Sequence, residues 1–215
     1  MSPELVTGLT AVRVRENLER ARGVIAAAGR DPADVELLAA VKYVPVDELD
    51  VLAEAGIELV GENRAQDLLA KREGYADTFT WDFIGNLQSR KVRDVAPAVR
   101  LIHSVASDSV LSQLGHHPAP EVLVQVNLAG EEDKGGVPPE ALAEFIAQCP
   151  VPVTGLSTMP PAVARPEENR RYFARLAELA AEHGLARLSM GTSQDFAVAA
   201  SEGATIVRLG SVLYR

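Results

Sequence analysis

Leu37-Leu38-Ala39-Ala40-Val41-Lys42-Tyr43 is an apolar run that ends at a single lysine. The run is too short for a helix, and helix-start signals follow it at Pro45, so we expect a strand that is buried on both faces. In a parallel α/β protein, ligands bind at the carboxyl ends of the strands, where Lys42 would stand. A lysine partly desolvated there loses some preference for the charged form, and its neutral amine can attack an aldehyde to form a Schiff base. The alternative is an ordinary lysine that reaches water from the strand end.

The composition is that of an ordinary globular protein. The chain has 215 residues, 47% of them hydrophobic and 24% charged, which suits one domain spanning residues 1–215. The net charge of −9 argues against a nucleic-acid partner, because binding to phosphate backbones needs basic patches. No secretory leader and no membrane-spanning run are present, so we expect a cytoplasmic protein without a membrane partner. Cys149, the only cysteine, is expected to pack in a helical stretch.

Helical and extended patterns alternate along the whole chain. A long helix is expected over residues 3–28, with Ser2 as its N-cap, ahead of the strand that leads to Lys42. Seven further strands are expected, each after a helical segment, at residues 57–60, 79–84, 101–103, 121–127, 153–156, 185–188 and 205–208. This alternation predicts an α/β fold, a single (β/α)8 TIM-type barrel whose extra N-terminal helix covers the place of a short last helix. An open doubly wound sheet is the main alternative, although no dinucleotide-binding glycine motif follows an early strand.

A charged, glycine-rich segment spans residues 130–136. Such a segment can be a calcium site when oxygen ligands alternate along it, and that alternation is missing here. We therefore expect a surface loop at this position and no metal site in the chain.

Two loops near the end of the chain have the composition of a phosphate site. Residues 189–193, Ser-Met-Gly-Thr-Ser, are expected to end the seventh strand and begin a helix, and Gly210 and Ser211 follow the eighth. In barrels these two loops often bind phosphate through backbone N–H groups and hydroxyls. The alternative is purely structural: Thr192 and Asp195 would be a helix-capping pair, and Gly210 would be a turn glycine.

Closure of the barrel would bring these loops to Lys42. Strand eight would then lie beside strand one, and with it Arg208, which must find a partner or reach water at the end of an apolar strand. An imine-forming amine, a phosphate site and a group facing the ring nitrogen are what pyridoxal 5'-phosphate requires. We therefore expect this cofactor.

Seven segments of the chain, spread from Leu37 to Tyr214, form a recognisable set: residues 38–42 (LAAVK), 61–63 (GEN), 83–91 (FIGNLQSRK), 103–105 (HSV), 125–127 (QVN), 189–195 (SMGTSQD) and 207–211 (VRLGS). Together they resemble the pyridoxal phosphate homeostasis protein family, also described as proline-synthase co-transcribed proteins and related in fold to the N-terminal barrel of alanine racemases. The resemblance implies a fold type III pyridoxal phosphate barrel. It implies these roles: Lys42 forms the Schiff base, Ser193, Gly210 and Ser211 contact the phosphate, Arg208 faces the pyridine nitrogen, and Asn63 lines the pocket.

Five positions depart from the pattern of that family. Asp82 stands where a histidine is usual and Ala106 where an aspartate is usual. Val41 replaces a serine, and Ser157 and Thr192 each replace a methionine. None of these departures removes an expected cofactor contact, but they change the shape of the pocket rim.

Three functions fit these residues. We favour a protein of intracellular pyridoxal 5'-phosphate homeostasis that holds the cofactor on Lys42 without robust catalysis, passes it to apo enzymes and is a monomer. The alternative is a racemase-type enzyme of weak activity, although racemases of this fold take a second acid-base residue from a further domain that we do not expect here. A lysine aldolase acting on a phosphorylated sugar is the third function, and it would carry no chromophore.

Overall fold

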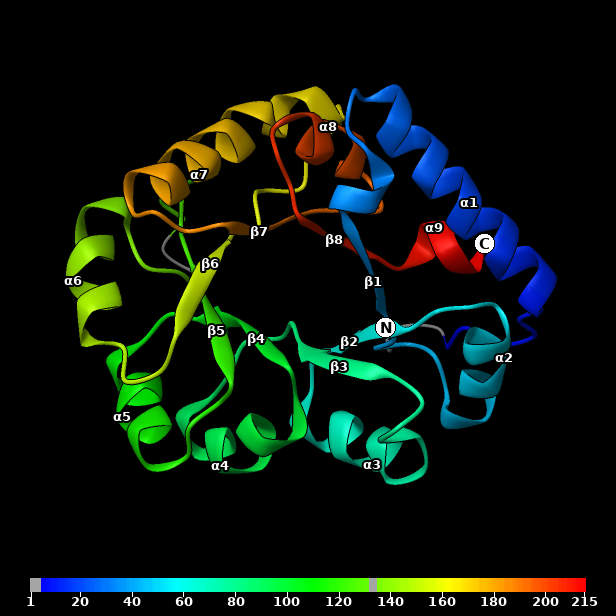
Figure 1. Cartoon of the computed structure of the whole chain (residues 1–215), viewed down its shortest axis with the longest axis horizontal. Helices are drawn as coiled ribbons and strands as arrows, with labels where there is room; N and C mark the ends of the chain where they lie inside the picture. Colours follow the sequence, from blue (N-terminus) through cyan, green and yellow to red (C-terminus); the bar gives the residue numbers. More distant parts are fainter. Residues whose placement is uncertain (1–4, 132–134) are drawn as a thin grey trace.

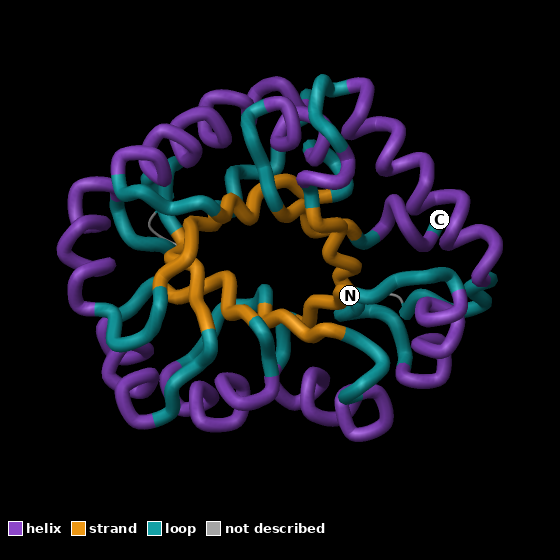
Figure 2. The backbone as a smooth tube through the Cα atoms, viewed as in Figure 1, coloured by secondary structure: helices purple, strands orange, loops and turns teal. Residues whose placement is uncertain are grey.

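The computed structural model describes residues 5–131 and 135–215, and in it eight parallel strands form a ring with helices outside (Figure 2). The strands are β1 (Glu36–Ala40), β2 (Leu59–Glu62), β3 (Thr80–Phe83), β4 (Leu101–Val105), β5 (Glu121–Gln125), β6 (Val153–Ser157), β7 (Arg187–Thr192) and β8 (Ile206–Leu209). Their order follows the sequence, and β8 pairs with β1 to close the barrel. The predicted (β/α)8 barrel is confirmed, and the open sheet is wrong because β1 has a neighbour on both edges.

Helices cover the outer face of the barrel (Figure 1). They are α1 (Ala11–Ala27), α2 (Leu49–Glu54), α3 (Ala65–Tyr75), α4 (Val92–Val95), α5 (Asp108–His116), α6 (Leu142–Gln148), α7 (Arg170–Glu182), α8 (Phe196–Ser201) and α9 (Ser211–Tyr214). Short 3-10 turns are η1 (Pro32–Asp34), η2 (Val46–Glu48), η3 (Ser89–Lys91), η4 (Ala96–Ala98), η5 (Pro139–Ala141) and η6 (Pro166–Asn169). No helix within the described ranges is long and apolar enough to span a bilayer.

Helix α1 covers the part of the barrel where the last helix is short. It lies beside the four-residue helix α9 (Figure 1). Its buried stripe includes Val14, Leu18 and Ile25, which recur at the helical period. The buried Asn17 on this face donates from Nδ2 to the carbonyl oxygens of Leu213, at 2.9 Å, and of the C-terminal residue, at 3.0 Å. The extra N-terminal helix therefore has the expected place, and it also ties down the end of the chain.

The start of α1 was predicted too early. Its N-cap is Thr10, and the described residues before it are not helical. The expected cap Ser2 lies outside the described residues. Instead of a helix, residues 5–9 form a segment that is tied to the loop after β1, because the N–H of Val6 donates to the carbonyl of Tyr43 at 2.8 Å. Two more backbone N–H groups of this segment donate to the carboxylate of Glu48, so tertiary hydrogen bonds override the local helical pattern.

Several strand boundaries also differ from the prediction by a few residues. The largest differences are at β2, which spans Leu59–Glu62 where 57–60 was predicted, and at β7, which spans Arg187–Thr192 where 185–188 was predicted, so both strands exist but begin and end later in the sequence. Residues 189–192 therefore belong to the strand, and α8 begins only at Phe196. Residues 132–134 of the charged loop lie outside the described residues.

The interior of the barrel has an apolar layer and a polar one. Leu38, Leu101, Leu123 and Ile206 form a buried apolar cluster that is separate from the larger core between sheet and helices. Since side chains alternate along a strand, neighbours such as Ala39 belong to the outer core, and this small cluster fills the barrel. Other buried interior positions are polar, and several of them contact one another directly.

Candidate functional site

The loops after β1 and β8 meet at the C-terminal edge of the barrel. In the β1–β8 pair, Leu38 stands opposite Arg208 and Ala39 opposite Leu209. Gly210 lies close enough to β1 that a Cβ placed on it would be 3.9 Å from the Cβ of Ala40. The expected meeting of the first and last strands is therefore observed. Lys42 and Ser211 follow this contact within two residues on their own segments.

Lys42 stands in a turn just beyond β1. The turn is closed by a hydrogen bond from the N–H of Val44 to the carbonyl of Val41 at 2.9 Å. The side chain of Lys42 is exposed, and its Nζ lies 4.8 Å from the centroid of the Tyr43 ring. The expected partial desolvation of Lys42 is therefore not observed, because the turn places the residue past the strand end and in contact with solvent.

A buried ion pair holds this turn from below. Lys71 of α3 donates from Nζ to Oε1 of Glu62 at 2.5 Å and to the carbonyl of Val41 at 2.6 Å. The other carboxylate oxygen of Glu62 accepts the backbone N–H of Asn63 at 2.7 Å, and Asn63 itself is half-buried. The pair therefore fixes both the turn that carries Lys42 and the segment that carries Asn63. Sequence reasoning missed it, although a charged residue ending the apolar strand β2 was a signal for a buried partner.

Ser193 joins the two loops that were expected to bind phosphate. Its Oγ accepts the backbone N–H of Gly210 at 3.0 Å and that of Val212 at 3.3 Å. Ser193 and Gly210 are half-buried, and Ser211 is exposed at the start of α9. The structure therefore brings Ser193, Gly210 and Ser211 together as one group, in which the N–H groups of Gly210 and Val212 already donate to Ser193 and the hydroxyls of Ser193 and Ser211 can donate to a ligand.

Thr192 and Asp195 have a structural role beside this group. The backbone N–H of Thr192 donates to Oδ1 of Asp195 at 2.7 Å, and its Oγ1 donates to the same oxygen at 3.0 Å. The buried Asp195 also accepts a hydrogen bond from Asn169 at 2.8 Å. Local hydrogen bonds thus occupy the Thr192–Asp195 pair, so its role is structural, but the expected helix cap is wrong, because Asp195, the N-cap of α8, makes no side-chain hydrogen bond to that helix.

Arg208 extends into the barrel interior, where it is only 7% exposed. Its Nη1 donates to the carbonyl of Ser189 at 2.7 Å and to the Ser189 Oγ at 2.6 Å. Its Nη2 donates to the carbonyl of Thr158 at 2.9 Å and contacts the sulfur of Met159. Burial lowers the pKa of Arg208 to about 10, so the guanidinium remains charged at neutral pH.

The contacts of Arg208 continue through the barrel. Oγ of Ser189 lies 2.8 Å from Nδ1 of His103, and Nε2 of His103 lies 3.1 Å from Oδ2 of Asp82. Asp82 accepts two hydrogen bonds from Arg100, at 3.0 and 2.7 Å, and Arg100 also forms a two-point ion pair with Glu36. We call Asp82, His103, Ser189 and Arg208 the interior network. Sequence reasoning noted Asp82 only as a departure from the family and found no partner for it.

Burial and hydrogen bonding set the charges of the interior network. Burial lowers the pKa of His103 and outweighs the opposing effect of Asp82. Burial alone would raise the pKa of Asp82, but hydrogen bonds from His103 and Arg100 hold it below its ordinary value. The network therefore combines an ionised carboxylate, a neutral imidazole and a guanidinium at neutral pH.

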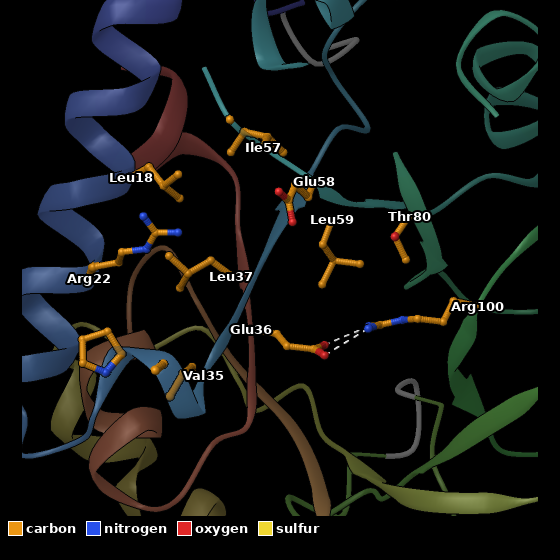
Figure 3. Close-up of a pocket in the computed structure, with 13 residues that line it drawn as sticks. Leu18, Arg22, Val35, Glu36, Leu37, Ile57, Glu58, Leu59, Thr80 and Arg100 are labelled. Carbon is orange, nitrogen blue, oxygen red and sulfur yellow. Dashed lines mark hydrogen bonds and ion pairs between the residues drawn. The ribbon is translucent and has the colours of Figure 1, made fainter. Parts of the chain in front are cut away.

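A cavity of about 660 Å³ lies at the opposite end of the barrel (Figure 3). Arg22 of α1, together with Glu36, Glu58 and Arg100 near the N-terminal ends of the strands, contributes its charged lining. None of the described residues that line it is a lysine or a residue of the C-terminal edge, so it is separate from the site of Lys42. Within the described ranges, no three His, Cys, Asp or Glu side chains are grouped to hold a metal ion.

The fold and this edge define a class of protein. A closed parallel barrel with a lysine after β1, and with serine hydroxyls after β7 and β8, has the architecture of the fold type III barrels. No family model matches the chain. Curated relatives are more informative.

Two of these relatives show to which family the chain belongs. The pyridoxal phosphate homeostasis protein of Aquifex aeolicus is 40% identical over 218 residues, which cover 94% of this chain and 96% of the relative. The protein of the same name from Pseudomonas aeruginosa is 40% identical over 216 residues, which cover 95% and 91%. The chain belongs to the pyridoxal phosphate homeostasis protein family.

Solved structures agree with this assignment. PipY of Synechococcus elongatus has 30% identity and covers 94% of this chain and 100% of its own, with TM-scores of 0.83 without pyridoxal phosphate and 0.80 with it bound. A protein from Bifidobacterium adolescentis described as unknown has a TM-score of 0.87 at 29% identity, over 99% of both chains. A lysine/ornithine decarboxylase from Vibrio vulnificus, with a TM-score of 0.67 at 16% identity, covers 95% of this chain and 62% of its own and shares the fold alone.

Proposed function

We propose that this protein binds pyridoxal 5'-phosphate and serves in its intracellular homeostasis, holding the cofactor as a Schiff base on Lys42. The observation that carries the proposal is the contact of β1 with Gly210, which gathers the Lys42 turn and the loops of Ser193 and Ser211 at one edge. The PipY structure with pyridoxal phosphate bound supports it. Bound at this edge, the cofactor supplies an aldehyde for an amine and a phosphate for N–H and hydroxyl donors.

Each residue of the edge has a role in this proposal. Lys42 would supply the amine that condenses with the aldehyde of the cofactor, with loss of water, and its exposure would keep the resulting C=N bond accessible to exchange with an incoming amine. Ser193, Gly210 and Ser211 bind the phosphate. The hydroxyl of Ser193 is already oriented by the hydrogen bonds that it accepts from two backbone N–H groups. Asn63 lines the pocket from the segment that follows β2.

Arg208 is proposed to face the pyridine nitrogen of the cofactor. Its guanidinium stays charged at neutral pH, since its lowered pKa is still about 10. A cation at that position disfavours protonation of the ring nitrogen, which makes the ring a weaker electron sink. This property restrains carbanion chemistry on the cofactor.

The proposal extends to partners and compartment. The loaded protein passes its cofactor to apo enzymes that depend on pyridoxal phosphate, acts in the cytoplasm and is a monomer. A delivery assay tests the first statement. In one sample the loaded protein is mixed directly with an apo enzyme, and in the other a semipermeable membrane separates the two proteins. Faster activation on contact supports delivery to a protein partner, and equal rates oppose it.

Substitution of Lys42 tests the attachment. We expect the wild type to become yellow with added pyridoxal phosphate, and borohydride reduction to fix the cofactor on the peptide that contains Lys42. Lys42→Ala should lose the visible absorbance and keep its circular dichroism, because an exposed turn lysine contributes little to the core. Lys91→Ala, a change at a partly exposed lysine of η3, is the control and should retain the absorbance. Cofactor fixed on another lysine, or no colour in the wild type, would contradict the proposal.

A turnover screen on the same loaded sample separates the alternatives. We expect no amino acid to be racemised or decarboxylated at a rate that matches a dedicated enzyme. Robust racemisation would favour the racemase-type function. Cleavage of a phosphorylated sugar by a protein that remains colourless would favour the aldolase.

A further inference from the structure

The interior network connects the middle of the barrel to the edge where Lys42 stands. We propose that Asp82, acting through a neutral His103 and Ser189, is a positioning residue that fixes the orientation of the Arg208 guanidinium at the cofactor site. This inference rests on the proposed function, since it assigns Arg208 to that site.

The two ends of the network determine the direction of every hydrogen bond between them. An ionised carboxylate can only accept hydrogen bonds, and a guanidinium can only donate them. Because the ionised Asp82 can only accept, the neutral His103 carries its proton on Nε2 and donates it to Asp82, which leaves Nδ1 as an acceptor. Ser189 Oγ accepts from Arg208, and the hydroxyl proton of Ser189 is directed to Nδ1 of His103. The distances alone do not say which ring nitrogen of His103 carries the proton. The arrangement of donors and acceptors around it predicts the Nε2–H tautomer.

His103 is neutral because of the groups that surround it. Asp82 on β3 faces its Nε2, Ser189 on β7 faces its Nδ1, and the hydroxyl of Ser157 on β6 donates to its backbone carbonyl. Burial opposes a positive charge at this ring most strongly, and the cations of Arg208 and Arg100 add to that effect. A neutral imidazole can accept from Ser189, whereas an imidazolium cannot.

Arg100 keeps the far end of the network in place. It lies between Asp82 and Glu36 in the wall of the cavity at the N-terminal ends of the strands, where Figure 3 shows its ion pair with Glu36. Its two hydrogen bonds to Asp82 favour the ionised carboxylate. Asp82 is therefore held as an acceptor.

The consequence for Arg208 is a fixed guanidinium plane. Nη1 donates to two oxygens of Ser189, and Nη2 donates to Thr158 on the neighbouring segment. If the hydroxyl of Ser189 rotated to donate elsewhere, its oxygen would no longer present a lone pair to Nη1 in the same direction. The direction of the Ser189 hydroxyl, which His103 and Asp82 determine, is thus the link between Asp82 and the orientation of Arg208.

Asp82→Asn tests this link with almost no change in volume. An asparagine can donate from Nδ2 to Nε2 of His103, which would move the histidine proton to Nδ1 and force the Ser189 hydroxyl to turn. Glu36→Gln is the matched control, because it removes the other carboxylate partner of Arg100 and leaves the interior network intact. Ser189→Ala removes the link itself, and Ser189→Thr, which retains the hydroxyl, is its conservative partner.

Two measurements are made on the cofactor-free protein. Long-range 1H–15N spectra should show His103 as the Nε2–H tautomer in the wild type and in Glu36→Gln, and as the Nδ1–H tautomer in Asp82→Asn. The Nη resonances of Arg208 should be separate in the wild type and Ser189→Thr, and should merge in Asp82→Asn and Ser189→Ala as rotation becomes faster. The third measurement is pyridoxal phosphate affinity, which should fall by about tenfold in Asp82→Asn, since one oriented charge-assisted hydrogen bond is lost.

The outcomes separate this inference from the proposed function. An Nδ1–H or protonated His103 in the wild type would overturn the inference, and so would a folded Asp82→Asn whose Arg208 resonances are unchanged. If Asp82→Asn does not fold, the comparison of Ser189→Ala with Ser189→Thr decides by the same Arg208 measurement. Failure of the wild type to bind pyridoxal phosphate would instead remove the proposed function, and the spectra of the cofactor-free protein would still test the positioning of Arg208.

Discussion

A buried ion pair, Glu62 with Lys71, holds the turn that carries the exposed Lys42. Glu62 is fully buried and Lys71 is 6% exposed, and both of their charges are compensated within the pair and its backbone contacts. Breaking such a pair leaves one uncompensated buried charge, which costs far more than a surface ion pair contributes. The pair therefore makes the position of the turn sensitive to Lys71, a residue of α3.

Replacement of Lys71 tests this dependence. Lys71→Met should lower the free energy of unfolding by about 3 kcal/mol or more, because the carboxylate of Glu62 stays buried without its cation. Urea denaturation followed by circular dichroism measures the change. The double variant Lys71→Met with Glu62→Leu should recover most of the loss, since no charge is then buried. A single variant as stable as the wild type would contradict a buried, ionised pair.

His103 makes the stability of the protein depend on pH. Its folded pKa lies below the ordinary value of 6.5, so the unfolded chain binds the proton more readily than the folded one. Stability should therefore fall as the pH drops below about 6.5, with a slope of up to about 1.4 kcal/mol per pH unit from this group until its folded pKa is passed. The lowered pKa of Asp82 acts in a more acidic range, where its stabilising contribution is lost as the pH falls through its folded pKa.

Urea denaturation at about pH 7.5 and about pH 5.5 measures this dependence. His103→Gln should be less stable than the wild type at the higher pH, and the difference should shrink at the lower one. His116→Gln, a change in the last turn of α5, is the control and should preserve the wild-type slope. An unchanged slope in His103→Gln would rule out this histidine as its source.

At the level of elements, the end of β7 depends on a glycine. Gly191 has a φ of 89°, and a Cβ placed on it would lie 2.5 Å from the Cβ of Ala199 in α8. The close approach of strand and helix fixes the start of the loop that carries Ser193. No other residue type adopts this conformation here without strain.

Gly191→Ala should therefore destabilise the protein by at least about 2 kcal/mol, from both the positive φ and the overlap with α8. The same substitution in an Ala199→Gly background is the matched comparison, because the overlap is relieved there and the backbone strain remains. Thermal unfolding of all four proteins measures the coupling between the two sites. Equal losses in both backgrounds would show that the overlap has no role.

The sequence predicted some elements better than others, for identifiable reasons. The strands were found because a barrel covered by helices buries both faces of each strand, which makes the strands apolar runs between helical segments. Helix α1 was found from its apolar stripe. The start of α1 was missed because the carboxylate of Glu48, distant in sequence, binds the backbone of residues 5–9. The interior network was missed because its members come from β3, β4, β7 and β8, and no local pattern relates them.

At the scale of the whole molecule, closure of the barrel creates the candidate site. Residues 42 and 211 are separated by most of the sequence, and they come together because β8 pairs with β1 in parallel. Alternation of helices and strands was compatible with both a closed barrel and an open sheet, and only closure makes the first and last strands neighbours. The roles of Lys42, Asn63, Ser193, Arg208, Gly210 and Ser211 in holding a cofactor remain predictions that the experiments above test.

Closure also bears on self-association, and we expect a monomer. A closed barrel has no unpaired strand edge to which a second copy could add a strand. The large apolar side chains exposed in the described ranges, Leu5, Val12, Val46, Leu69 and Met159, are distributed over several elements, and a net charge of −9 opposes contact between copies.

Sedimentation velocity over a wide range of protein concentration, with and without pyridoxal phosphate, measures the mass. We expect the mass of one chain throughout. Measurements in high salt, which screens the net charge, should give the same result if the surface has no specific interface. A mass that rises with concentration at low salt would contradict the prediction, and a rise confined to high salt would show that charge repulsion alone keeps an existing interface apart.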